Sequence, residues 1–81
     1  MFISYSTQAM KALAGLAEID RGAHYIALLR IQSALISLDD GVIDTTVTLA
    51  IDDDKYVIPF TAAKKGVEVT INELDWQVNG I

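Results

Sequence analysis

A chain of 81 residues with a net charge of −5 and 52% hydrophobic residues is predicted to form one acidic domain, residues 1–81. This apolar content excludes intrinsic disorder, and the absence of cysteine excludes disulfide scaffolds, thiolate zinc sites and cysteine nucleophiles. The single histidine, His24, excludes most catalytic triads and multi-histidine metal sites.

A first helix is predicted at about residues 7–20. Ser6 suits the N-cap position, because its hydroxyl can accept a hydrogen bond from a free N–H of the first turn. Apolar residues, Leu13 and Leu16 among them, then recur at three- and four-residue steps and give the helix one apolar face. Gly22 can adopt the left-handed conformation that ends many helices.

A second helix is predicted at about residues 23–38, with a wider apolar arc than the first. Its apolar side chains, from Tyr25 to Leu38, leave a narrow polar stripe that includes Arg30 and Ser33. Such a wide arc indicates contacts on more than one side: with the first helix, with the sheet and with a second copy of the chain. We therefore expect a symmetric homodimer, because a small chain gains stability by burying such a surface between copies.

After the second helix the apolar period changes to two, which predicts strands. Residues 42–51 alternate and are rich in β-branched side chains, as a half-buried strand requires. Residues 52–55 are predicted to form a tight connection, and residues 56–60 a second strand. Residues 62–66 are predicted to form a short connector before a third strand at residues 67–72.

Two positions disturb this simple pattern. The alternation shifts by one residue at Glu73, which indicates a bulge or a turn, and residues 74–78 then extend the third strand or form a fourth. Pro59 has no N–H to donate, so it belongs at an edge, a strand end or a bulge. Either Pro59 lies near the end of its pairing, or the third strand crosses to the far side of the first and the sheet order is 2-1-3.

Together these elements predict an α+β fold in the order ααβββ. An N-terminal antiparallel helical hairpin packs on one face of a small antiparallel β-meander of three strands, or four if residues 74–78 pair separately. The expected core residues are Leu13, Leu16, Leu28, Leu35, Val47, Leu49 and Ile51.

The negative charge is concentrated in the second half of the chain. Residues 1–38 hold three basic and two acidic residues, for +1, whereas residues 39–81 hold three lysines and nine carboxylates, for −6. This balance argues against direct binding of nucleic acid or of an anionic membrane surface. It favours a protein partner with a basic surface. A second interpretation is that the charge only maintains solubility.

No stretch of the sequence is predicted to span a membrane. The longest apolar stretch, residues 25–38, has fourteen residues and is interrupted by polar ones, whereas a bilayer of roughly 30 Å needs about 20. Residues 1–6 show no basic region before an apolar run, so we expect no secretory signal and a cytoplasmic location.

The densest carboxylate cluster, Asp52–Asp54, does not match a known metal-binding pattern. In a calcium loop that starts at Asp52, Val57 would stand where glycine is needed and Ala63 where glutamate is needed. A hairpin turn with solvated charges is the simpler interpretation. We therefore expect no metal and no cofactor.

Catalytic patterns are also missing. General acid–base work by His24 would need a nearby nucleophile or carboxylate, and no spacing in the sequence supplies one. Asp39, Asp40 and Asp44 could pair as acid and base, but neighbouring aspartates are typical of a turn. The Lys64–Gly66 segment lacks the glycine-rich loop and following helix of a phosphate-binding loop. We expect that the protein is not an enzyme.

These observations favour a non-catalytic protein-binding module. The size and charge resemble those of small acidic inhibitors, immunity proteins and anti-defence accessory proteins, a class that phages and other mobile elements often encode. The alternative is a structural protein that assembles with itself and has no heterologous target; a regulatory domain for a small molecule or metal is a third hypothesis. The predicted partner-binding residues lie in the connectors: Asp39, Asp40, Asp44, Asp52, Asp53 and Asp54.

Overall fold

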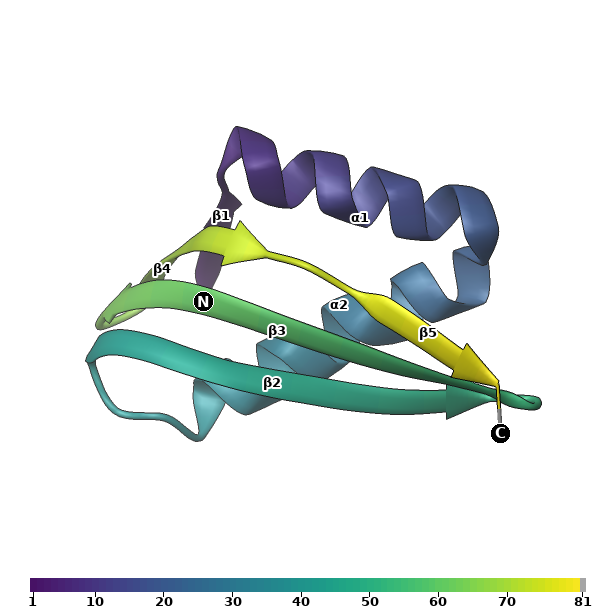
Figure 1. Ribbon diagram of the computed structural model, residues 1–81. Coiled ribbons are helices and arrows are strands. Elements are labelled where there is room, and N and C mark those ends of the chain that lie inside the picture. The colour runs from purple at the N-terminus through teal and green to yellow at the C-terminus, as the bar shows by residue number, and fades with distance from the viewer. Residues whose placement is uncertain (81) are drawn as a thin grey trace.

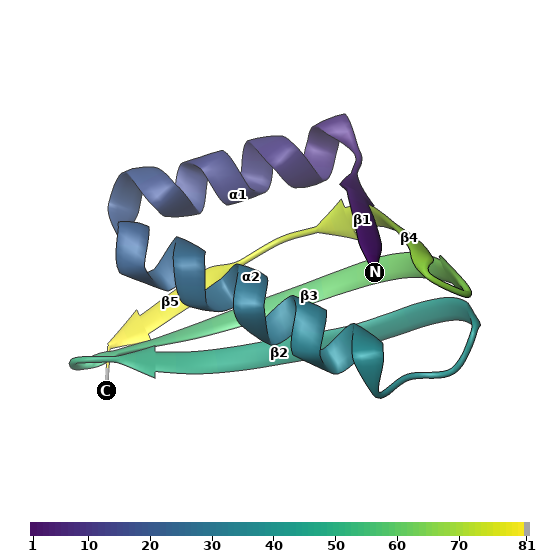
Figure 2. The ribbon, with the colours of Figure 1, turned by 180° about the vertical axis from the view of Figure 1, so that it is seen from behind.

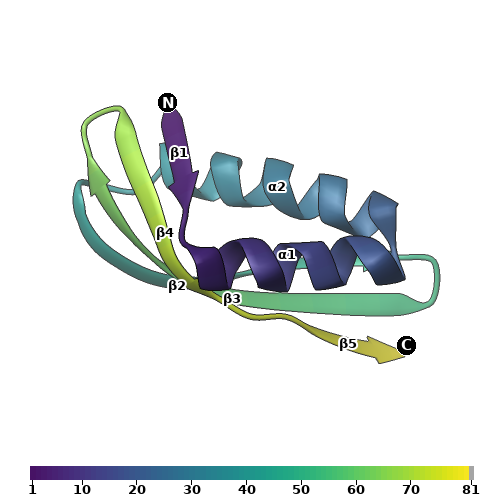
Figure 3. The same ribbon diagram turned by 90° about the horizontal axis from the view of Figure 1, so that it is seen from above.

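A computed structural model describes residues 1–80 as two helices packed on one face of a five-stranded sheet (Figure 1). The elements follow in the order β1 (Phe2–Tyr5), α1 (Thr7–Ile19), α2 (Arg21–Ile36), β2 (Gly41–Ile51), β3 (Asp54–Lys65), β4 (Glu68–Leu74) and β5 (Gln77–Gly80). Helix α1 packs mainly on β4 and helix α2 mainly on β2. The two helices lie on the same side of the sheet, and no described element covers its other face (Figures 2 and 3).

The α+β class is confirmed, but the sheet is not the simple antiparallel meander that the sequence pattern predicted. Strands β2, β3 and β4 pair antiparallel in chain order. Strand β1, which was not predicted, pairs in parallel with β4 and forms one edge, and β5 pairs with β3 beyond the end of β4. Strand β1 has only four residues, too few for a period of two to stand out before the helical pattern begins.

The two helices are joined by a single residue, Asp20. Its backbone N–H donates to the Leu16 carbonyl oxygen at 2.9 Å, and its carboxylate accepts from the Ala23 N–H at 3.0 Å. Asp20 therefore caps both helices, and Gly22 lies inside α2 instead of ending α1. The helices run in opposite directions and splay apart from this junction (Figure 2).

Strands β2 and β3 form one long hairpin. Their register runs without interruption from Gly41–Lys64 to Ile51–Asp54, so the turn consists of Asp52 and Asp53 alone. Asp52 has a φ of 54°, a left-handed conformation that aspartate tolerates better than most residues.

The predicted connector at residues 62–66 is wrong, because β3 continues to Lys65. Ala62 faces the core and is fully buried, whereas Ala63 is exposed. Because both residues are alanine and have the same hydrophobicity, this alternation between buried and exposed positions does not show in the sequence. The turn to β4 therefore contains only Gly66 and Val67.

Pro59 lies at the break between β4 and β5. The β3–β4 ladder starts one residue later, at Phe60–Leu74, and the Pro59 carbonyl oxygen accepts from the Asp75 N–H at 3.0 Å. The first alternative for Pro59, near the end of its pairing, is confirmed, and the sheet order 2-1-3 is wrong.

The irregularity expected near Glu73 is a bulge. Thr61 pairs with Glu73 and the next residue of β3, Ala62, pairs with Ile71, so Asn72 is the extra residue. After the bulge the chain leaves β3 and then returns as β5, a separate strand.

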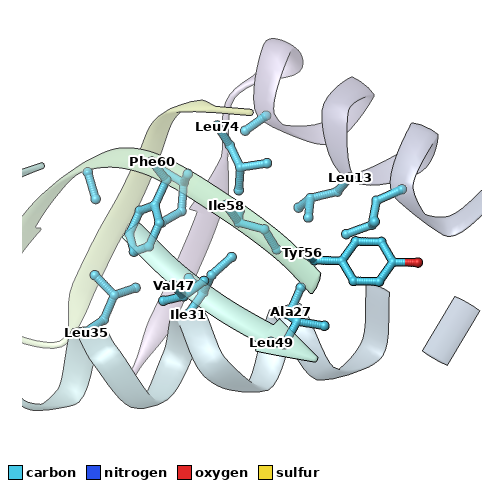
Figure 4. Close-up of a cluster of buried hydrophobic side chains, with 14 of the residues drawn as sticks. Leu13, Ala27, Ile31, Leu35, Val47, Leu49, Tyr56, Ile58, Phe60 and Leu74 are labelled. Carbon is cyan, nitrogen blue, oxygen red and sulfur yellow. The ribbon is translucent and has the colours of Figure 1, made fainter. Parts of the chain in front are cut away.

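The core lies between the helices and the inner face of the sheet (Figure 4). The largest fully buried side chains come from both helices and from β3 and β4: Leu16, Ile31, Leu35, Tyr56, Ile58, Phe60, Ile71 and Leu74. Five of the expected core residues are buried: Leu13, Leu16, Leu35, Val47 and Leu49. Leu28 and Ile51 are only partly buried and pack against the margin of the core.

Candidate functional site

The sheet face that the helices leave uncovered carries mainly small side chains on β2 and β3. Its outward residues on β2 and β3 are mostly short and carry few charges: Val42, Asp44, Thr46, Thr48, Ala50, Lys55, Val57, Pro59, Thr61, Ala63 and Lys65. Short side chains give a partner few features to contact, so a local depression among them is the candidate place for specific contacts.

Such a depression, of about 610 Å³, opens at the break between β4 and β5. It lies where the β3–β4 ladder ends, at Phe60–Leu74, beside Pro59, which has no N–H to pair there. Its wall is polar apart from three residues: Gln8, Asp44, Pro59, Phe60, Thr61, Asn72, Glu73, Leu74 and Asp75.

Three of the residues that line this depression carry carboxylates: Asp44, Glu73 and Asp75. Asp44 pairs with Thr61, and Thr61 pairs with Glu73, so the register places Asp44 and Glu73 in one row on either side of Thr61, whereas Asp75 follows the end of β4. Adjacent strands are about 4.8 Å apart, which sets Asp44 and Glu73 about 10 Å from each other across the row. Within residues 1–80, no three acidic or histidine side chains come close enough to hold a metal ion. The spacing suits a larger cationic group.

Gln8 fixes the end of β4 that shapes the depression. The β1–β4 pairing ends at Tyr5–Ile71, and the Ser6 N–H still donates to the Ile71 carbonyl oxygen at 2.9 Å. The chain then turns into α1, and the Gln8 side chain continues the pairing. Its Nε2 donates to the Leu74 carbonyl oxygen at 2.8 Å, and its Oε1 accepts from the Leu74 N–H at 2.9 Å.

Trp76 holds the next segment against α1. Its indole Nε1 donates to the Ala12 carbonyl oxygen at 2.8 Å, and its backbone N–H donates to the Asp75 carboxylate at 2.8 Å. The indole ring passes close to Gly15, where a Cβ would lie in ordinary van der Waals contact with it, at 3.8 Å. The position of Asp75 is therefore fixed by hydrogen bonds of its two neighbours, Leu74 and Trp76.

The six predicted partner-binding residues do not form one surface. Asp39 and Asp40 lie in the loop between α2 and β2, where the Asp40 carboxylate accepts from the Gly66 N–H at 3.0 Å and joins two loops. Asp44 lines the depression. Asp52–Asp54 lie at the opposite end of β2, whose eleven residues span about 33 Å.

The sequence interpretation missed Glu73, Asp75 and Gln8. The sequence marks this region by two signals, the shift in alternation at Glu73 and the proline at position 59. Neither signal shows which strand pairs with the segment around Glu73. Lys64 has a structural role: its Nζ donates to two carbonyl oxygens at the end of α2, at 2.7 and 2.6 Å.

Neither helix in the described part of the chain combines the length and apolarity needed to cross a membrane. Comparison with known proteins found no family model that matches the chain, no similar curated protein and no similar solved structure.

Proposed function

We propose that the protein is a non-catalytic protein-binding module, an acidic inhibitor or accessory protein that binds a basic surface of a partner protein. The observation that supports this proposal is that Asp44, Glu73 and Asp75 all line one open depression beside the uncovered face of the sheet. A chain with a net charge of −5 attracts a basic partner and disfavours an acidic one.

In this proposal an arginine or lysine of the partner enters the depression. The exposed ring of Pro59 offers an apolar surface for the aliphatic stem of such a side chain, while the carboxylates surround its charged end. An arginine fits this arrangement better than a lysine, because its planar guanidinium can donate to several oxygens at once.

The remaining acidic groups act at longer range. Asp39 and Asp40 at one end of the sheet, and Asp52–Asp54 at the other, extend the negative potential beyond the depression. Such groups steer the encounter of two proteins, and their effect weakens as salt shortens the screening length to about 10 Å at 0.1 M.

Two triple variants with the same change in charge separate contact from steering. One removes the depression carboxylates, Asp44→Asn, Glu73→Gln and Asp75→Asn; the other removes those of the hairpin turn, Asp52→Asn, Asp53→Asn and Asp54→Asn. The wild-type protein, immobilised, first captures its partner from lysate for identification by mass spectrometry. Association and dissociation rates are then measured with the purified partner for all three proteins.

We expect the depression variant to dissociate at least about tenfold faster than wild type, because it loses contacts, and the hairpin variant mainly to associate more slowly. After Asp75→Asn the side-chain oxygen can still accept from the Trp76 N–H, and asparagine tolerates the positive φ of residue 52, so both variants should keep the wild-type circular dichroism spectrum. Equal effects in the two variants would show that only net charge matters. Unchanged binding in both would show that the acidic residues serve solubility alone.

A further inference from the structure

Strand β2 forms a free edge of the sheet, and the inference drawn from this edge is independent of the proposed function. The sheet order β1-β4-β3-β2 leaves one side of β2 unpaired over its eleven residues. Exposed edge strands are templates for another strand, and proteins usually protect them with lysine, proline, a bulge or a short length. Strand β2 has none of these protections, and its only charged residue is Asp44.

The register shows which backbone groups of β2 face the free edge. A two-residue turn makes the flanking pair, Ile51–Asp54, a hydrogen-bonded pair, and such pairs alternate along an antiparallel ladder. The odd-numbered residues of β2 therefore bond to β3, and the even-numbered residues point outward. A contact from α2 agrees with the assignment of the even-numbered residues to the free edge: Arg30 Nη1 donates to the Thr48 carbonyl oxygen, at the long distance of 3.5 Å.

The same contact places one flank of α2 above the free edge. Ser33 and Ser37 follow Arg30 at three and seven residues and share its flank, and both are small and exposed. Leu29 and Ile36, beside this flank, are 49% and 63% exposed. The edge is therefore two layers deep, with a strand below and, above it, a helix flank that carries Arg30 together with small and apolar side chains.

We propose that this edge pairs with the β2 edge of a second copy of the chain about a two-fold axis, which joins two sheets into one. In an antiparallel pairing centred on Thr46, each Thr46 bonds to the other, Asp44 faces Thr48 of the second copy, and Val42 faces Ala50 of the second copy. No like charges meet, and threonine and β-branched pairs are favourable cross-strand neighbours.

The dimensions of the molecule fit a stable dimer. The described chain measures 37 by 24 by 17 Å, and the eleven residues of β2 span about 33 Å, most of the longest dimension. An edge of 37 by at least 17 Å has an outline of about 630 Å², against the roughly 800 Å² per partner of a standard interface.

Because the two-fold axis stands perpendicular to the joined sheet, both acidic depressions would open on the same face of the dimer. A partner with two basic sites could then bind both copies at once. The dimer and the depression are nevertheless separable, since Asp44→Asn alters a side chain and leaves the backbone groups of the edge in place.

The first test is the oligomeric state of the wild-type protein and of two matched variants, measured by sedimentation over a range of concentrations. We expect wild type to have twice the 8.8 kDa mass of one chain. Thr46→Lys, which brings two lysines together at the axis, should weaken the dimer on the order of 100-fold. Thr70→Lys, an exposed change on the same sheet face but on β4, should leave it intact.

The second test is amide hydrogen exchange of the wild-type protein, which decides the question even if Thr46→Lys fails to fold. Exchange at Asp44, Thr46 and Thr48 should slow as the concentration rises, whereas Thr45 and Val47, bonded to β3, should be protected throughout. A monomer at every concentration overturns the proposal, and so does a dimer in which the Thr46 amide exchanges freely. Protection that appears only when a heterologous peptide is added overturns it as well.

Discussion

The replacement of Gln8 by leucine tests how the end of β4 is held. Leucine fills a similar volume but cannot make the two hydrogen bonds at 2.8 and 2.9 Å to the backbone of Leu74, a residue that is only 2% exposed. Each bond contributes roughly 0.5–1.5 kcal/mol, and water can reach part of this site, so we expect a total loss of about 2 kcal/mol. For a domain of this size, such a loss lowers the melting temperature by about 8–16 °C.

Thermal unfolding followed by circular dichroism measures this loss. The control is Gln32→Leu, an exposed glutamine on α2, which should change stability by less than about 0.5 kcal/mol. The fluorescence of Trp76, two residues after Leu74, reports whether the bulge itself loosens. Equal stabilities for the two variants would refute the conclusion that Gln8 continues the pairing of β4.

Three further predictions concern the fold. Lys64→Met should cost about 2 kcal/mol, because the ammonium group donates to two carbonyl oxygens at the end of α2, whereas the exposed Lys65→Met should cost less than about 0.5 kcal/mol; denaturant titration compares the two. Ile31→Ala, at a fully buried site, should cost about 3 kcal/mol, and Leu28→Ala, at a partly buried one, only about 1–2 kcal/mol; a reversed order in thermal melts would place the core elsewhere. Burial, and then nearby carboxylates, raise the pKa of Tyr56 above its ordinary value of 10.0, so its contribution to stability is full below pH 10 and is lost as the pH rises through the raised pKa. Tyr56→Phe should therefore lose less stability between neutral and strongly alkaline pH than wild type, and identical stability–pH curves would contradict this assignment.

The parts of the fold that the sequence predicted correctly depend on local signals. The hydroxyl of Ser6 accepts from the Ala9 N–H at 3.1 Å, as its place before an apolar period indicated. The long alternation of β2 and the bulge before β5 were visible for the same reason, because period and cap are properties of neighbouring residues.

The parts that the sequence did not predict depend on pairing between distant segments. Strand β1 and the Gln8 side chain reach β4 across 66 residues, and a four-residue strand has no period of its own. The depression requires two registers and a bulge together, since Asp44 meets Glu73 only through Thr61. No local pattern contains that information.

The separation of the predicted acidic residues into two distant groups, by contrast, follows from the length of the predicted strand between them. Asp39–Asp44 and Asp52–Asp54 flank the same predicted strand, and a strand of about ten residues separates its ends by about 33 Å. The two groups therefore lie at opposite ends of β2, although few residues separate them in the sequence.

We propose that the acidic depression on the uncovered sheet face binds a basic partner. Nuclear magnetic resonance gives the most direct test of this binding. Isotope-labelled protein is titrated with the captured partner at low and at high salt, and the backbone amide signals are followed. We expect shifts centred on Thr61, Glu73 and Asp75 that weaken as salt is added. Shifts confined to Asp52–Asp54 or to the outer face of α2, with Thr61 and Glu73 unmoved, would contradict it.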